Sequence, residues 1–167
     1  MDDTTRTECL VCRKHKGEVT TPGGTVYQDE LIYVSHAGLF GDEAEHFLGH
    51  LFVEPRRHVP ELADLTDEEA QAIGLYVTRI ARALTDTLDV EHVYSFVFGD
   101  GVPHVHVHVI GRQRGTPREY WGTRVDEWPG ARRGGEAEIE QVASRIRDAL
   151  RDIGLSLIHI SEPTRPY

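Results

Sequence analysis

The chain has 167 residues, of which 39% are hydrophobic and 28% are charged, and its formal net charge is −10 at pH 7. This length suits one compact domain with one sizeable core. The negative charge argues against nucleic acid binding through the overall field, although a local pocket with positive groups could hold a small anionic substrate. No apolar run approaches 18 residues and residues 1–8 are polar, so we expect no membrane segment, no signal peptide and a cytoplasmic location.

The first third of the chain predicts short strands and loops. Two glycines and a proline in residues 21–25 indicate a turn. Residues 26–34 hold two β-prone runs around a polar centre, which indicates a hairpin. The polar residues 37–45 predict a loop, and residues 50–54 predict a short strand that closes at Pro55.

Two amphipathic helices follow from capping and periodicity. Thr66 with Glu69 three residues later forms a capping box, which predicts a helix start. Apolar residues at spacings of three and four then place one stripe on one face, at Ile73, Val77, Ile80, Leu84 and Leu88. A second stripe predicts a C-terminal helix that ends at Gly154, with Ile139, Val142, Ile146, Leu150 and Ile153 on one face.

Between the two helices, residues 92–98 and 103–110 predict strands joined by a tight turn at residues 99–101. Residues 111–135 are rich in Gly, Pro, Arg and Trp and predict a long ordered arm, which could close over a substrate or pack at a subunit interface. Strands with short connections and separate helices predict an α+β fold with a mainly antiparallel sheet.

The most informative segment is His-Val-His-Val-His-Val-Ile at residues 104–110. In a strand, alternation places His104, His106 and His108 on one face and the valines on the other. Three imidazoles are costly on a core face, because each ring carries a donor and an acceptor that need partners. Two functional interpretations remain: a metal site shared by two or three rings, or a phosphate-handling face with a nucleophilic imidazole.

This segment resembles the signature of the histidine triad family, in which three histidines alternate with apolar residues. The strand, proline, basic pair and histidine of residues 49–58 (GHLFVEPRRH) are similar to another element of that family. The resemblance covers about residues 9–115. It implies an α+β fold with a five-stranded, mainly antiparallel sheet, one long helix packed on it and a second C-terminal helix.

The resemblance also implies a function and roles for individual residues. The protein would hydrolyse nucleotide phosphate bonds, in nucleoside phosphoramidates or dinucleoside polyphosphates, with His106 as the nucleophile that forms a nucleotidyl-histidine intermediate. His108 would bind the phosphate and protonate the leaving group. The nucleotide-binding set would be Asp100, Gly101 and His108, with backbone amides near Gly101 around the phosphate oxygens. A nucleotidyltransferase or phosphorylase, and a zinc-stabilised nucleotide-binding module with little turnover, are the alternatives.

Two departures from the family pattern affect these roles. Many members carry Gln-Ser or Gln-Thr shortly before the triad, where this chain has Asp100 and Gly101, and an acidic Asp100 would repel phosphate unless it faces a ribose hydroxyl or a histidine. Many members also carry an aspartate for the ribose where this chain has Ser35 and His36. His36 and His50 are therefore further candidates for ligation or ribose contact, although a satisfied sheet histidine is the favoured interpretation of His50. His15, His46 and His92 are interpreted as incidental.

The two cysteines are too few for a disulfide framework, and Cys9 and Cys12 have the CxxC spacing that lets two thiolates share one tetrahedral ion. A redox pair or two free thiols are the alternatives. Zinc-containing histidine triad proteins imply His58 and His104 as the other two ligands of a closed, structural Zn²⁺ site. The family resemblance also implies a homodimer that acts on a small nucleotide. The negative charge and the lack of a long apolar run predict no nucleic acid and no membrane partner.

The expected organisation is a disordered N-terminus at residues 1–8, a histidine triad domain at 9–115, and an arm with a helix at 116–154. Residues 155–167 contain LSLIHISEPTR, which resembles the translation of a sequencing adapter. We therefore expect residues 155–167 to be a non-native tail without a role in function.

Overall fold

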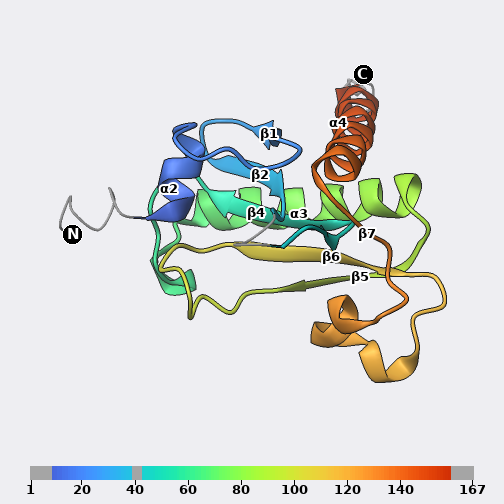
Figure 1. The fold of residues 1–167 in the computed structure, drawn as a ribbon. Coiled ribbons are helices and arrows are strands. Elements are labelled where there is room, and N and C mark those ends of the chain that lie inside the picture. Colours follow the sequence, from blue (N-terminus) through green and yellow to red (C-terminus); the bar gives the residue numbers. More distant parts are fainter. Residues whose placement is uncertain (1–8, 39–42, 159–167) are drawn as a thin grey trace, which may run out of the picture.

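The computed structural model describes residues 9–38 and 43–158, so the predicted disorder at residues 1–8 lies outside the described residues. A five-stranded antiparallel sheet forms the centre, in the spatial order β1, β2, β4, β6, β5 (Figure 1). Its strands are β1 Thr25–Gln28, β2 Ile32–His36, β4 His50–Pro55, β5 Val90–Phe96 and β6 Val107–Gln113. The α+β fold expected from the sequence, with its five-stranded sheet, is confirmed.

The long helix α3 (Asp67–Thr87) packs across one face of this sheet, and α4 (Glu136–Ile158) packs beside it. Thr66 accepts a hydrogen bond from the backbone N–H of Glu69, and the Glu69 carboxylate accepts one from the N–H of Thr66, so the predicted capping box is present. Such a cap contributes about 1 kcal/mol to helix stability. The predicted apolar stripe of α3 lies in the core, together with Tyr76 and Ala83.

Among the described residues, the helices other than α3 and α4 are short (Figure 1). The helix α2 (Leu10–His15) lies over β2 and β4 at one end, where its side chains meet Ser35 and Glu54. Two 3-10 helices, η2 (Arg118–Tyr120) and η3 (Gly122–Glu127), belong to the predicted arm. The pairing of β3 (His46–Phe47) with β7 (Arg133–Gly134) ties the end of this arm to the β2–β4 connection. A further short 3-10 helix, η1 (Leu62–Asp64), precedes α3.

The predicted start of the triad strand was wrong by four residues. The strand β6 begins at Val107 rather than at Pro103, and residues 97–106 form a long connection instead of a tight turn. The backbone before β6 bonds elsewhere: the N–H of Val105 donates to the carbonyl of Val59, and Pro103 has no N–H to offer a neighbouring strand. Val105 and Val107 still pack into the core, so the apolar half of the predicted alternation is present.

The predicted helix end at Gly154 was also wrong, because α4 continues to Ile158. A glycine inside a helix costs only about 1 kcal/mol relative to alanine, which the flanking turns can offset. Residues 155–158, the first four of the expected tail, thus belong to the helix backbone, whereas residues 159–167 lie outside the described residues.

Candidate functional site

The site is built on the face of the sheet that α3 leaves uncovered. In β4, Leu51 and Val53 enter the core, so the period-two alternation turns His50, Phe52 and Glu54 to the other face. Phe52 is the register partner of His108 in β6. This alternation brings the strand of residues 50–55 and the triad segment together on one surface.

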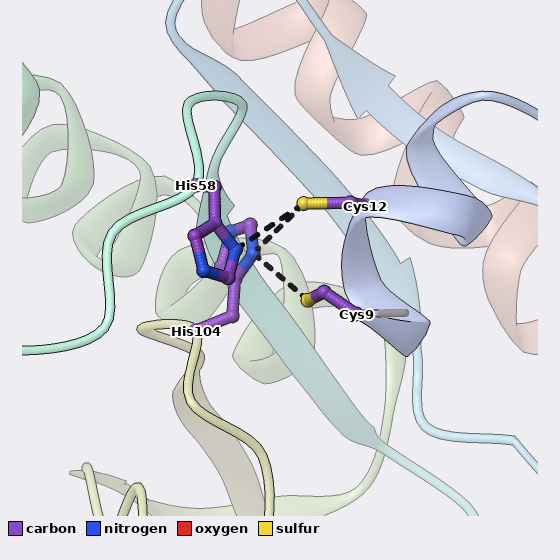
Figure 2. A group of neighbouring side chains, drawn as sticks. All are labelled: Cys9, Cys12, His58 and His104. Carbon is purple, nitrogen blue, oxygen red and sulfur yellow. Dashed lines mark hydrogen bonds between the residues drawn. The ribbon is translucent and has the colours of Figure 1, made fainter. Parts of the chain in front are cut away.

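The four predicted metal ligands meet at one end of this surface (Figure 2). The Cys9 sulfur lies 3.5 Å from Nδ1 of His104, and the Cys12 sulfur lies 3.4 Å from Nδ1 of His58 and 3.6 Å from Nδ1 of His104. All four ligand atoms lie within 4.8 Å of one another. Cys9, Cys12 and His104 are buried, so the cluster is shielded from solvent.

These distances fit a tetrahedral metal ion. Zinc bonds of about 2.3 Å to sulfur and 2.0–2.1 Å to nitrogen, at a tetrahedral angle, place sulfur and nitrogen about 3.6 Å apart. The observed sulfur–nitrogen separations of 3.4–3.6 Å match that geometry. The Cys2His2 donor set is the chemistry that structural zinc sites use.

The hydrogen bonding of His104 prepares its ring for this role. Its Nε2 lies 2.9 Å from the carbonyl oxygen of Pro55, and because a carbonyl only accepts, Nε2 carries the proton. The lone pair therefore sits on Nδ1, which faces the two sulfurs, in the arrangement that orients metal-bound histidines. Burial lowers the pKa of His104 to about 4, although the hydrogen bond to the Pro55 carbonyl acts in the opposite direction and raises it. The ring is therefore neutral near pH 7.

His106 has the opposite arrangement. Its Nδ1 lies 2.6 Å from the backbone carbonyl oxygen of His104, so Nδ1 carries the proton and the lone pair is on Nε2. The His106 side chain is half-buried and lines a cavity of about 260 Å³. A neutral imidazole with its lone pair on an accessible nitrogen is a nucleophile.

His108 makes a ring-to-ring hydrogen bond with His50, whose Nε2 lies 2.9 Å from Nδ1 of His108. The other nitrogen of His50, Nδ1, is buried without a hydrogen-bond partner among the described residues. A buried lone pair without a partner is less costly than a buried N–H, which favours His50 as the donor to His108. His108 then carries its own proton on Nε2 and can donate it to a bound phosphoryl group.

Aromatic side chains surround His108. Phe96 stacks on its ring at 4.8 Å between centroids, and Phe52 meets it edge to face at 4.9 Å. Desolvation by this packing, followed by the nearby His106, lowers the pKa of His108 to about 4. His108 is thus neutral near pH 7 in the free protein, and an anionic group beside it would favour the protonated ring.

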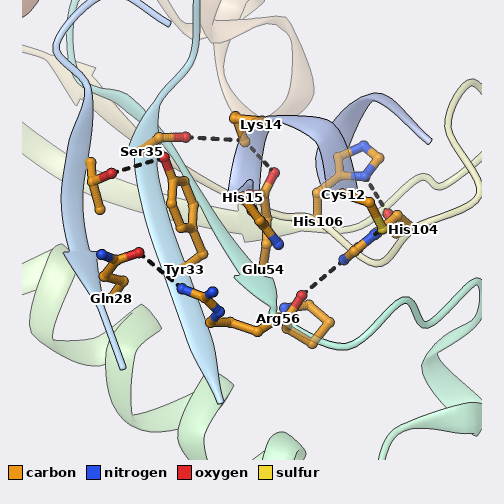
Figure 3. Close-up of polar contacts among 12 residues, drawn as sticks. Cys12, Lys14, His15, Gln28, Tyr33, Ser35, Glu54, Arg56, His104 and His106 are labelled. Atoms are coloured by element: carbon orange, nitrogen blue, oxygen red, sulfur yellow. Dashed lines mark hydrogen bonds and ion pairs between the residues drawn. The ribbon is translucent and has the colours of Figure 1, made fainter. Parts of the chain in front are cut away.

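A buried ion pair of Lys14 in α2 and Glu54 in β4 (Figure 3) lines the cavity. Nζ of Lys14 donates to Oε1 of Glu54 at 2.8 Å and to Oγ of Ser35 at 3.1 Å, and Nε2 of His15 lies 3.0 Å from Oε2 of Glu54. Burial opposes ionisation of Glu54, but the charge of Lys14 and the hydrogen bonds outweigh it and hold the pKa of Glu54 below its ordinary value. The Glu54 carboxyl is therefore ionised at neutral pH.

The remaining sequence candidates lie in different settings. Asp100 and Gly101 are exposed in the connection between β5 and β6, and neither lines the cavity, whereas the next residue, Val102, does. His36 lines the cavity, but its Nδ1 donates to the carbonyl of Ala37 and its Nε2 accepts from the N–H of Gly49. Both ring nitrogens of His36 are thus used by backbone groups, which leaves no lone pair for a metal or a ribose.

Sequence reasoning missed several members of the site. His50 was interpreted as a satisfied sheet histidine and His15 as incidental, yet His50 supports His108 and His15 supports Glu54. Lys14 was not singled out. The period-two pattern of residues 50–54 could have indicated His50 and Glu54, because both share a face with Phe52; the contacts of Lys14 and His15 depend on where α2 docks, which no local pattern specifies.

The chain thus combines an α+β fold, a Cys2His2 cluster and a cavity that His106 lines. The family model described as "HIT domain" matches residues 20–115. The chain belongs to this histidine triad family, as its sequence resemblance predicted. The family match begins after Cys12, so it does not include the two cysteines.

Known proteins agree with this assignment. Protein hit of Bacillus subtilis is 30% identical over 109 residues, which cover 62% of this chain and 70% of that protein. The purine nucleoside phosphoramidase of Escherichia coli is 27% identical over 96 residues, 54% of this chain and 76% of the enzyme. The bis(5'-adenosyl)-triphosphatase of Dictyostelium discoideum is 35% identical over 72 residues, 40% of this chain and 48% of the enzyme.

A solved structure supports the fold over a longer range. The crystal structure of a zinc-bound histidine triad family protein from Mycobacterium smegmatis has a TM-score of 0.67 and 22% sequence identity. It covers 90% of this chain and 99% of its own. The structural similarity therefore extends well beyond the residues 20–115 that the family model matches.

Proposed function

We propose that the protein hydrolyses a phosphorus–nitrogen or phosphoanhydride bond in a nucleotide, by way of a nucleotidyl-histidine intermediate on His106. The observation that carries this proposal is the hydrogen bond from Nδ1 of His106 to the carbonyl of His104, which leaves the lone pair on Nε2 of a ring that lines the cavity. Relatives named as a phosphoramidase and a triphosphatase support a nucleotide substrate at the level of the family.

In the first step, Nε2 of His106 forms a bond to the α-phosphorus, and the bond from that phosphorus to the leaving group breaks. The leaving group departs with the bonding electron pair and takes the proton from Nε2 of His108. This step starts from the imidazolium form of His108, which takes its second proton, on Nδ1, from solvent when the anionic phosphoryl group binds, and His50 then accepts the hydrogen bond from Nδ1. In the second step, water attacks the phosphorus, the bond to His106 breaks with its electrons returning to Nε2, and the proton of the water passes to His108. The products are a nucleoside monophosphate and the protonated leaving group.

The Cys2His2 cluster supports a structural role for Zn²⁺. Cys9, Cys12, His58 and His104 would hold the ion, and it would tie α2 to the segment that carries His106. All four positions would be protein ligands, so no coordination site would remain for a substrate. The chemistry that the ion supplies is cross-linking of the fold, and the reacting groups are those of the protein.

Asp100 and Gly101 remain proposed contacts to the nucleotide. Both are exposed beside Val102, which lines the cavity, so a bound phosphate at His106 would lie near this connection. An acceptor other than water would make the protein a nucleotidyltransferase or phosphorylase, because the first step is the same.

The test is a substrate panel with product analysis. The protein is incubated with adenosine and guanosine 5'-phosphoramidates and with dinucleoside polyphosphates, each with and without inorganic phosphate. Release of nucleoside monophosphate supports a hydrolase, and nucleoside diphosphate that forms only with added phosphate supports a phosphorylase. Binding of nucleotides with no product from any of these compounds would contradict both and leave a binding module.

No helix in residues 9–38 and 43–158 has the length and apolarity that a membrane crossing requires. The cytoplasmic location and the homodimer remain proposals. In the described sheet, β5 is an edge strand, and its outer edge could pair with a second copy. Light scattering of the purified protein that gives the mass of one chain would contradict the homodimer.

A further inference from the structure

The ion pair of Lys14 and Glu54 needs an explanation beyond stability. Lys14 is 8% exposed and Glu54 is 1% exposed, so both charges have lost most of their hydration. Replacing such a buried pair by apolar side chains of similar volume is often neutral or stabilising. The pair lines the same cavity as His106, and buried charges beside a candidate nucleophile mark functional positions.

The rest of the cavity provides apolar walls. Leu10, Val11, Val19, Pro22, Phe52 and Val102 all line it. A flat aromatic ring could insert between such walls, with one polar edge against Lys14 and Glu54 and its substituent directed to His106. Pockets of this kind gain affinity from the apolar walls and specificity from a few placed polar groups.

The polar groups of the pair still have hydrogen-bonding capacity. The ammonium of Lys14 has three N–H donors, of which two reach Ser35 and Glu54, and no acceptor among the described residues takes the third. Each carboxylate oxygen of Glu54 accepts one hydrogen bond, from Lys14 or His15, and has a second lone pair. The pair therefore presents a donor next to an acceptor.

We propose that Lys14 and Glu54 read the edge of the nucleobase and select a 6-oxopurine, guanine or hypoxanthine, over adenine. This inference rests on the proposed nucleotide function. A 6-oxopurine presents the O6 acceptor next to the N1–H donor, which complements an ammonium beside a carboxylate. Adenine presents the reverse, an N6 amino group next to an N1 lone pair, so its amino group would face the ammonium and its lone pair the carboxylate.

The test compares inosine and adenosine 5'-monophosphates, which differ only at positions 1 and 6 of the base. Calorimetric titration of the His106→Asn protein measures binding without turnover. Inosine monophosphate should bind at least about tenfold more tightly, since a hydrogen bond to a charged group contributes this factor or more. The double variant Lys14→Met with Glu54→Met, made in the same background, should bring the two affinities together.

Lys16→Met is the control for loss of a nearby lysine, because Lys16 is exposed and lies two residues after Lys14. It should preserve the preference for inosine monophosphate. Equal or tighter binding of adenosine monophosphate to the His106→Asn protein would overturn the inference without any further variant, and so would an unchanged preference in the folded double variant or no binding of either nucleotide.

The readout separates this inference from the proposed function. Preferential binding of inosine monophosphate that depends on Lys14 and Glu54, with no turnover by the wild-type protein, would sustain the inference and refute the enzyme. Turnover of both purine nucleotides with equal efficiency, and equal binding of the two monophosphates, would sustain the enzyme and refute the inference.

Discussion

His104 and His106 are two residues apart, and their rings are prepared for opposite tasks. At His104 the N–H of Nε2 donates a hydrogen bond to a backbone carbonyl, and the lone pair of Nδ1 faces the cysteines of the cluster. At His106 the N–H of Nδ1 donates a hydrogen bond to a backbone carbonyl, which leaves the lone pair on Nε2 of a ring that lines the cavity. Which nitrogen meets a backbone carbonyl thus decides whether the imidazole ligates in a closed cluster or remains available to a substrate.

The largest effect should come from removing the available lone pair. His106→Asn keeps a polar side chain that can donate to the His104 carbonyl, so the fold and nucleotide binding should persist. Turnover should fall by several orders of magnitude, because the amide cannot act as the nucleophile. The measurement is kcat for the best substrate of the panel, together with nucleotide affinity.

His92→Asn is the matched control, since His92 is exposed on β5 and does not line the cavity. It should retain the wild-type kcat. Near-normal turnover by His106→Asn would end both the nucleophile assignment and the covalent mechanism.

Loss of the Cys2His2 cluster should lower the free energy of unfolding rather than change the reacting groups. Purified protein should hold about one zinc per chain, and Cys9→Ser should lose the metal and several kcal/mol of folding free energy, since metal binding is linked to folding. Metal analysis and thermal unfolding of both proteins measure this. Protein purified without chelators that contains no zinc, and whose two thiols both titrate freely, would contradict the site.

The leaving-group role predicts a smaller and conditional effect at His108. His108→Ala should reduce turnover strongly with a poorly departing amine and only weakly with a leaving group of low pKa, because only the first needs a proton. Steady-state rates over a series of phosphoramidates measure the dependence. Equal losses across the series would indicate that His108 binds phosphate without donating a proton.

The buried neutral histidines predict a dependence of stability on pH. The folded pKa values of His36 and His108 are lowered to about 4 from about 6.5, mainly by burial. Between pH 6.5 and 4 these histidines bind protons in the unfolded chain but not in the folded chain, so the free energy of unfolding should decrease as the pH falls through this range. Above pH 7 the histidines are neutral in both states and should not affect the pH dependence.

One such group contributes a slope of at most about 1.4 kcal/mol per pH unit. His36→Asn should therefore be less stable than wild type at pH 7 but should lose less stability between pH 6.5 and 4. Denaturant unfolding at several pH values measures this, and an unchanged slope in the variant would refute the contribution of His36.

The smallest effect is expected for deletion of residues 155–167. Among the side chains that the structure describes, Leu150 is the last one of α4 in the core cluster, and the helix backbone continues to Ile158. The melting temperature and turnover should remain within error. A large loss of either would show that the tail packs against the domain.

The contrast between the two histidines also shows what sequence can and cannot predict. The CxxC spacing placed Cys9 and Cys12 at one site, and the family resemblance added His58 and His104; the structure brings all four together. The capping box correctly predicted that α3 begins at Thr66. The hydrogen bonds of the two rings to different carbonyls could not be predicted, because they depend on where the backbone leaves the sheet before Val107.

The ion pair at the cavity was missed for a similar reason. Lys14 reaches Glu54 over 40 residues of chain, through the docking of α2 on the uncovered face of the sheet. Charged residues in a short helix ordinarily indicate a solvated surface. Only the tertiary structure shows that this lysine is buried at a cavity.

The most direct test of the central claim is to trap the intermediate. Wild-type protein is mixed briefly with a nucleotide substrate labelled in the α-phosphate, quenched under mildly alkaline conditions and digested for mass spectrometry. The account predicts a nucleotidyl adduct, labile to acid, on His106 in the peptide that contains all three triad histidines, and no adduct in His106→Asn protein. An adduct on His104 or His108, or rapid turnover with no adduct at any quench time, would contradict it.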